Sequence, residues 1–223
     1  MFDVDIHAHT RFFHWSPGEP TAYDPLGATL LAAASRRSDI DGVALTNHDY
    51  YEPFAAGAAK PQFIPGIEVT TTQGHALVLG PDPPTRTTPG SLTPREIVAR
   101  AHDADCAVVI PHPFRHGSIH ESGAAFDAVE VNGKHPRRAA RVHELAADLG
   151  LPVVAGSDAH YPFEAGRAYT RVDADELTPA SVVAAIRDGR VEPRVRSGPP
   201  QRLLRQAYEY IHRAKENSRA RQS

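Results

Sequence analysis

The sequence is poor in several features that mark particular classes of protein. Cys106 is its single cysteine among 223 residues, so an internal disulfide is excluded and a reduced, cytoplasmic setting is expected. No apolar run approaches the roughly 20 residues that cross a bilayer. A cleaved signal peptide would remove the first predicted strand, so we expect none. Because the net charge is only −3 with neutral histidines, the molecule as a whole is no polyanion binder by charge alone.

Histidine is the one residue in excess, with 13 copies, and two of them fall in the stretch DIHAHT at residues 5–10. Apolar Phe2, Val4 and Ile6 alternate there with polar residues, which is typical of a strand. On that pattern Asp5, His7 and His9 share a face, and the two imidazoles lie about 6–7 Å apart along the strand. That spacing lets both histidines reach one metal ion. The plainer alternative is a pair of histidines on a solvated strand face that binds no metal, and only the rest of the sequence can distinguish the two interpretations.

Short apolar runs alternate with helical patterns along most of the chain. We predict strands at 2–9, 42–48, 63–71, 75–80, 107–112, 128–133 and 151–158. Helices are predicted at 25–37, from 94 onward, at 136–149 and at 179–188, the second opened by a capping box of Thr93 and Glu96. About seven strands alternating with helices predict an α/β fold with buried parallel strands that close in a barrel-like way. Residues 1–200 are therefore expected to form a single domain.

Residues 201–223 follow a different pattern. Apolar side chains recur there at helical spacing, which predicts an amphipathic helix, at Leu203, Leu204, Ala207, Tyr208 and Ile211. After Lys215 the chain becomes basic and polar. This tail either contacts RNA or is a solvated terminus.

Polar side chains gather at the predicted strand ends, where α/β folds with parallel strands place their functional groups. Nine such residues converge in this way: His7, His9, His14, His48, Glu68, His75, His112, Asp158 and His160. Singly, a histidine such as His48 or His75 could equally hold a loop. Together, so many buried polar groups would stay unpaired without ions. Nitrogen and oxygen ligands without thiolate suit Zn, Mn or Fe.

Six motifs in order, DIHAHT, ALTNHD, GIEVT, GHALVLG, PHPFR and GSDAH, resemble those of the PHP family, named for polymerase and histidinol phosphatase. The resemblance covers residues 3–160 and implies a distorted (β/α)7 barrel with two or three divalent metal ions at the C-terminal ends of the strands. It implies three ligand groups: His7, His9, Glu68 and Asp158; then Glu68, His75 and His112; and His14, His48 and His160. Asn47 departs from the family's usual acid, and Asp49 could partly replace that charge. Glu130 is either another ligand or an acid that orients ligands.

The function predicted from these motifs is metal-dependent hydrolysis of a phosphate ester by metal-activated hydroxide. We expect Glu68 to bridge two ions and Asp158 to accept the nucleophile's proton. If metal does not fully engage His160, we expect it to protonate the leaving oxygen. Arg115 follows His112 in PHPFR and either grips phosphate or forms a surface salt bridge. The expected substrate is a small phosphomonoester such as histidinol phosphate, a nucleotide, or the end of a short nucleic acid. The alternatives are an amidohydrolase-like metal hydrolase and a non-catalytic, RNA-binding PHP-like scaffold.

Overall fold

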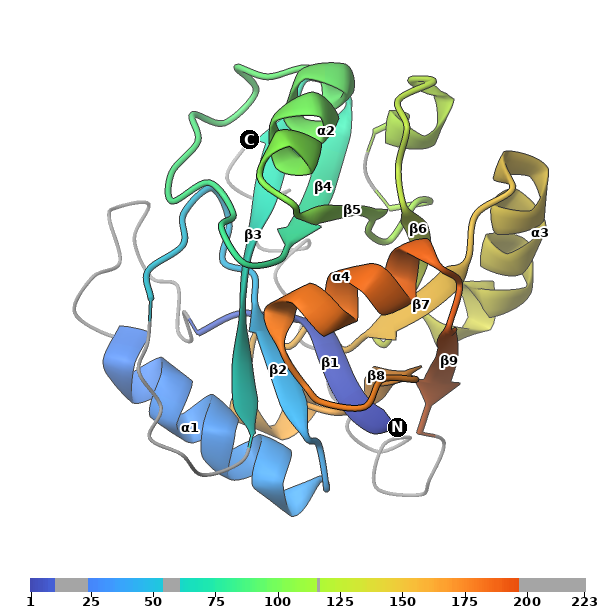
Figure 1. The fold of residues 1–223 in the computed structure, drawn as a ribbon. Coiled ribbons are helices and arrows are strands. Elements are labelled where there is room, and N and C mark those ends of the chain that lie inside the picture. The colour runs from blue at the N-terminus through green and yellow to red at the C-terminus, as the bar shows by residue number, and fades with distance from the viewer. Residues whose placement is uncertain (11–23, 54–60, 116, 197–223) are drawn as a thin grey trace, which may run out of the picture.

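Nine strands form one sheet that curls into a nearly closed barrel (Figure 1). The computed structural model describes residues 1–10, 24–53, 61–115 and 117–196. The strands are β1 (Phe2–Ala8), β2 (Gly42–Leu45), β3 (Gln62–Thr71), β4 (Gly74–Leu79), β5 (Ala107–Ile110), β6 (Ala128–Asn132), β7 (Val153–Gly156), β8 (Ala168–Val172) and β9 (Val191–Val195). Their order across the sheet is β7-β6-β5-β4-β3-β2-β1-β8-β9. The predicted single-domain α/β barrel is thus confirmed.

The barrel closes where β7 returns to β1 and β8. The hydroxyl of Thr170 on β8 accepts a hydrogen bond from the Ala155 amide at 2.8 Å and donates one to the Ala155 carbonyl at 2.9 Å. Past the end of β7, the Asp158 amide donates to the His7 carbonyl at 2.8 Å. These bonds bring Asp158 beside His7, although 150 residues separate them in the chain.

The barrel differs from the predicted one in strand number and direction. All seven predicted strands are present, and β8 and β9 are additional. Only four neighbouring pairs are parallel, β1–β2, β2–β3, β5–β6 and β6–β7, whereas β4, β8 and β9 run antiparallel to their neighbours. Pro193 lies in β9, at the edge of the sheet where proline is tolerated, and its presence concealed that strand in the sequence.

Four α-helices are present in the described part of the chain, as predicted: α1 (Asp24–Arg37), α2 (Pro94–Asp103), α3 (Ala139–Leu149) and α4 (Pro179–Arg187). The capping box of α2 is confirmed, because the Thr93 amide donates to Glu96 at 2.8 Å and the Glu96 amide donates to the Thr93 hydroxyl. The helix predicted to begin at 136 starts as the short 3-10 helix η2 (Pro136–Arg138). Two further 3-10 helices are η1 (Ile119–Glu121) and η3 (Pro162–Glu164).

Helix α4 seals the end of the barrel where the parallel strands begin (Figure 1). Its Val182, Val183 and Ile186 pack with Val4 and Ile6 in an apolar cluster that takes side chains from most strands. Helices α2 and α3 instead cover the outer face, in a second cluster. One end of the barrel is thus filled with apolar side chains, which leaves the opposite end for polar ones. Within the described ranges no helix is long and apolar enough to cross a membrane.

Candidate metal centre

An irregularity in β1 brings His7 and His9 together inside the barrel mouth. The pairing register of β1 with β2 shifts between Asp5 and Ala8. Strict alternation would place His7 on the face opposite Ile6, which belongs to the interior apolar cluster. Because of the shift, His7 is also turned inward, and its Nε2 lies 3.3 Å from that of His9. Both rings are almost fully buried.

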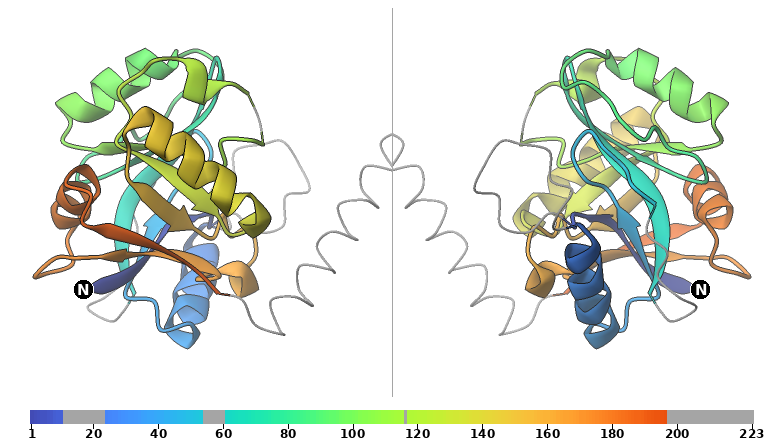
Figure 2. Two further views of the ribbon diagram at one scale, coloured as in Figure 1. Left: turned by 90° about the vertical axis from the view of Figure 1, so that its right-hand side faces the viewer. Right: turned by 90° about the vertical axis from the view of Figure 1, so that its left-hand side faces the viewer.

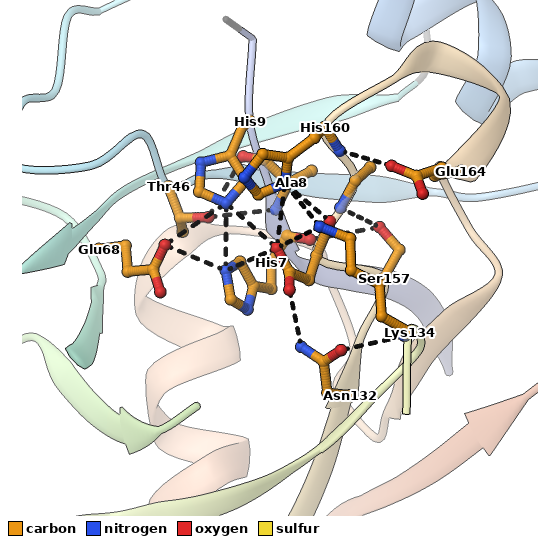
Figure 3. Close-up of polar contacts among 12 residues, drawn as sticks. His7, Ala8, His9, Thr46, Glu68, Asn132, Lys134, Ser157, His160 and Glu164 are labelled. Atoms are coloured by element: carbon orange, nitrogen blue, oxygen red, sulfur yellow. Dashed lines mark hydrogen bonds and ion pairs between the residues drawn. The ribbon is translucent and has the colours of Figure 1, made fainter. Parts of the chain in front are cut away.

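Glu68 of β3 is buried among imidazoles, and Figure 3 shows its carboxylate facing His7 and His9. Its Oε1 is 2.8 Å from His75 Nδ1 and 3.0 Å from His112 Nε2. Its Oε2 is 3.0 Å from His48 Nδ1, 3.4 Å from His9 Nε2 and 3.5 Å from His7 Nε2. Burial opposes ionisation of this carboxyl, but His48 and His7 hold its pKa well below the ordinary value. One buried carboxylate is therefore shared by five histidines.

The residues around Glu68 fit metal ions. Glu68 Oε2 is buried and accepts no well-formed hydrogen bond from any residue in the described ranges, although three imidazole nitrogens surround it. Ligand atoms come within 4.8 Å of one another in three sets: His7, His9 and Glu68; His48, Glu68 and His75; and His9, His48 and His160. An ion satisfies such an oxygen and the nitrogen lone pairs at once. The donors are nitrogen and oxygen only, which suits Mn, Zn or Fe.

Asp158 lies across the centre from Glu68. Its Oδ1 is 3.5 Å from His9 Nε2 and 3.1 Å from His160 Nδ1. Two cations also hold it, since Lys134 Nζ lies 3.0 Å from Oδ1 and an Arg115 nitrogen 3.0 Å from Oδ2. Despite burial, Lys134 and His7 keep the pKa of Asp158 well below its ordinary value. This carboxylate therefore joins the imidazole cluster to a pair of positive charges.

Glu130 of β6 contacts two residues of the cluster, His7 and His112, on the side away from Glu68. Its Oε1 is 2.8 Å from His7 Nδ1, and its Oε2 accepts hydrogen bonds from the His112 amide at 2.9 Å and the Asn132 side chain at 3.1 Å. A histidine held at Nδ1 by a carboxylate presents Nε2 in a fixed direction, which is the usual support of a metal-binding histidine. Gly156 makes this approach possible, because a Cβ there would lie 2.7 Å from Glu130 Oε1.

The structure brings eight of the nine predicted ligand positions into one cluster, and Arg115 lies at its edge. The ninth, His14, falls outside the described residues, as do the predicted helix and tail at 201–223. Asn47 binds the amide and hydroxyl of Thr10, next to His9. Asp49 accepts hydrogen bonds from Thr70 and Thr87, which secures the loop after His48, and its charge is one of the causes that raise the pKa of His75.

The sequence analysis missed two residues of the centre, and it placed a third, Asp5, on the wrong face. Lys134 and Asn132 follow Glu130 in VEVNGK at the end of β6, so the strand-end rule applied there could have found them. Asp5 was expected to share a face with His7 and His9. It instead accepts hydrogen bonds from the amides of Ser157 and Gly166, both at 2.9 Å, and thus ties β1 to the loop after β7. Burial raises the pKa of Asp5 to about 6.

We expect metal affinity to fall as the pH is lowered, beginning above the ordinary histidine pKa of 6.5 because two of the cluster histidines have raised pKa values. Burial favours the neutral ring of His7, but Glu130 and Glu68 outweigh it and raise the pKa well above the ordinary value, so an incoming ion displaces a proton. Glu68 likewise raises the pKa of His75 against the effect of burial. Calorimetry of Mn²⁺ binding in buffers of different ionisation enthalpy should detect proton release. An affinity that does not change between pH 8 and pH 5 would contradict ligation by these histidines.

The chain has relatives among known families and structures. Residues 136–191 match the family model described as PHP-associated, PHP_C. The structure of PsfC from Pseudomonas syringae PB-5123 is similar with a TM-score of 0.69 and 17% identity, over 94% of this chain and 98% of that one. A two-domain protein from Bacteroides vulgatus, which contains a predicted PHP-like metal-dependent phosphoesterase, is similar with a TM-score of 0.60 and 19% identity. The match covers 87% of this chain and 64% of that one.

A third similar structure is the lesion-specific endonuclease EndoQ from Pyrococcus furiosus, with a TM-score of 0.55 and 18% identity over 86% of this chain and 57% of that one. No curated protein matches the sequence. The solved structures share the barrel fold at low identity, and the PHP-associated match comes from the sequence itself. Together they relate residues 136–191 to PHP-associated sequences, and the fold of the described residues to that of PHP-like proteins.

Proposed function

We propose that this chain is a metal-dependent phosphoesterase that hydrolyses a small phosphomonoester, a nucleotide or the end of a short oligonucleotide. The observation that supports it best is the shared position of Glu68, which contacts five imidazoles while Asp158 and Arg115 lie on the other side of the cluster. Imidazoles and carboxylates serve ion binding, whereas a guanidinium beside them serves an anionic substrate. The names of the Bacteroides and Pyrococcus proteins agree with phosphate-ester chemistry.

The proposed ligands are the predicted ones, with Glu68 shared between two ions. His7, His9 and Asp158 would complete one group, and His75 and His112 the second. A third group would include His48 and His160, to which His14 or the adjacent His9 would contribute. Bound divalent ions supply an activated water and stabilise negative charge on a phosphoryl group. Mn, Zn and Fe all remain candidates.

The protein's own groups would position the ester and move the protons. Arg115 is partly exposed, and only one of its nitrogens is near Asp158, so its remaining N–H groups can hold two phosphate oxygens. Asp158 Oδ1 would accept the proton of the attacking water. His160 turns Nδ1 toward Asp158, and its ring would give a proton to the leaving oxygen only if the metal does not fully engage it.

The test combines elemental analysis of the purified protein with phosphate release from a panel of phosphomonoesters, nucleotides and short oligonucleotides, with and without added Mn²⁺. We expect bound divalent metal and phosphate release that chelation abolishes. Activity confined to amide or lactone substrates would instead establish the amidohydrolase-like alternative. A metal-free protein that binds RNA and hydrolyses nothing would be the non-catalytic scaffold, and would refute the proposal.

A further inference from the structure

A group of exposed arginines lies beside the metal centre on the segment that follows β6. These are Arg137 and Arg138 of η2 and Arg141 in the first turn of α3, and we call them the arginine rim. Among the residues that the structure describes, no carboxylate lies within 4.0 Å of any of the three. The sequence from Gly133 to His143 holds no acidic residue at all. The positive charge of the rim is therefore not neutralised locally.

The arginine rim is fastened to the loop that carries Arg115. Arg138 donates a hydrogen bond to the Phe114 carbonyl, and the Arg141 guanidinium lies 3.9 Å from the centre of the Phe114 ring. Phe114 directly precedes Arg115, which reaches Asp158. The left view of Figure 2 shows α3 on the outside of the barrel, beside β6. Positive charge thus continues from Arg115 to η2 and the first turn of α3.

The pKa of His135, which precedes η2, is affected by the same local positive charge. Burial, followed by the charges of Arg115 and Arg138, lowers the pKa of His135 to about 4. The whole chain carries a net charge of −3, so this positive region is a local feature and not a consequence of overall basicity. Surface arginines without acidic partners attract phosphate groups.

We propose that the arginine rim binds the backbone phosphates of a single-stranded nucleic acid whose end enters the metal centre. This inference rests on the proposed phosphoesterase function and selects its substrate class. A small metabolite would be enclosed by its site, whereas these arginines are exposed and extend the positive charge beyond Arg115 over about one helical turn. Successive cations along an exposed path suit a chain of phosphates.

The test is binding of a fluorescein-labelled, 5′-phosphorylated single-stranded oligonucleotide to the full chain, measured by anisotropy with chelator present so that nothing is cleaved. The variant R137Q/R141Q removes two rim charges and leaves the Arg138–Phe114 bond in place. We expect Kd to rise about tenfold at low salt, and the slope of log Kd against log salt to fall by about 1.4, the value for two phosphate contacts on a single strand. The variant R137Q/R141K restores one charge and should recover part of the affinity.

The matched control is R36Q/R37Q, which removes two exposed arginines from the last turn of α1, near the start of β2 and far from the barrel mouth. It should change Kd less than twofold. Equal effects of the rim and control variants, or none from either, would overturn the inference. A nucleoside diphosphate that loses as much affinity as the oligonucleotide would also overturn it, in favour of a subsite for one extra phosphate. Intact rim-dependent binding without any hydrolysis would refute the phosphoesterase function instead.

Discussion

Replacing Glu68 with glutamine is expected to reduce metal-dependent hydrolysis by about 10³-fold or more while leaving a folded protein. The carboxylate contacts five histidines, so its negative charge serves every ion that the cluster would hold. Glutamine keeps the shape and one acceptor oxygen but supplies no charge. Bound metal, measured by elemental analysis, should fall together with kcat/KM, and circular dichroism should show unchanged secondary structure.

The matched control for that variant is Glu192→Gln on β9. Glu192 is exposed and pairs with Arg194 at the surface, so both metal content and turnover should stay at the wild-type level. An active Glu68→Gln protein with a full complement of metal would remove Glu68 from its proposed bridging position. Loss of activity with metal fully retained would instead leave Glu68 a role in the reaction but not in ion binding.

Gly156→Ala is expected to cause the largest loss of stability, about 3 kcal/mol, together with a loss of metal affinity. The new Cβ would lie 2.5 Å from His7 Cβ and 2.7 Å from Glu130 Oε1, both on the inner side of the barrel. Neither group can move freely, because both are completely buried. The His7–Glu130 hydrogen bond would break, and His7 would lose its fixed orientation. Urea unfolding and Mn²⁺ titration would measure the two effects separately.

Gly150→Ala provides the comparison for Gly156→Ala. Gly150 ends α3 with a φ of +68°, and a Cβ there meets nothing within 4 Å. Alanine should therefore cost only the backbone strain of about 1–2 kcal/mol and leave metal affinity unchanged. If the two variants were equally stable and bound Mn²⁺ equally well, the close packing of Gly156 against the His7–Glu130 pair would have no functional consequence.

Local patterns in the sequence were sufficient to predict seven of the nine described strands, the four described α-helices and most of the side chains of the centre. The capping box at Thr93 and the apolar runs of the seven predicted strands depend on neighbours within a few residues, so they can be recognised from the sequence alone. The positions of the predicted strand ends were sufficient to identify the histidines, Glu68 and Asp158 as candidates for one site, because parallel strands place their C-terminal ends at one edge. Strand β9 was missed because Pro193 contradicts strand propensity, which edge pairing with β8 overrides.

The direction in which each side chain points and the residues that it contacts, in contrast, were decided only by the tertiary structure. The chain by itself determined which donor atoms are available and roughly where each one leaves its strand. Whether Asp5 faces the cluster or ties two loops depends on a register shift in β1, and whether Glu130 binds or orients depends on His7 across the barrel. Contacts between residues more than a hundred positions apart have no local signature, because they arise only when the sheet curls and its ends meet.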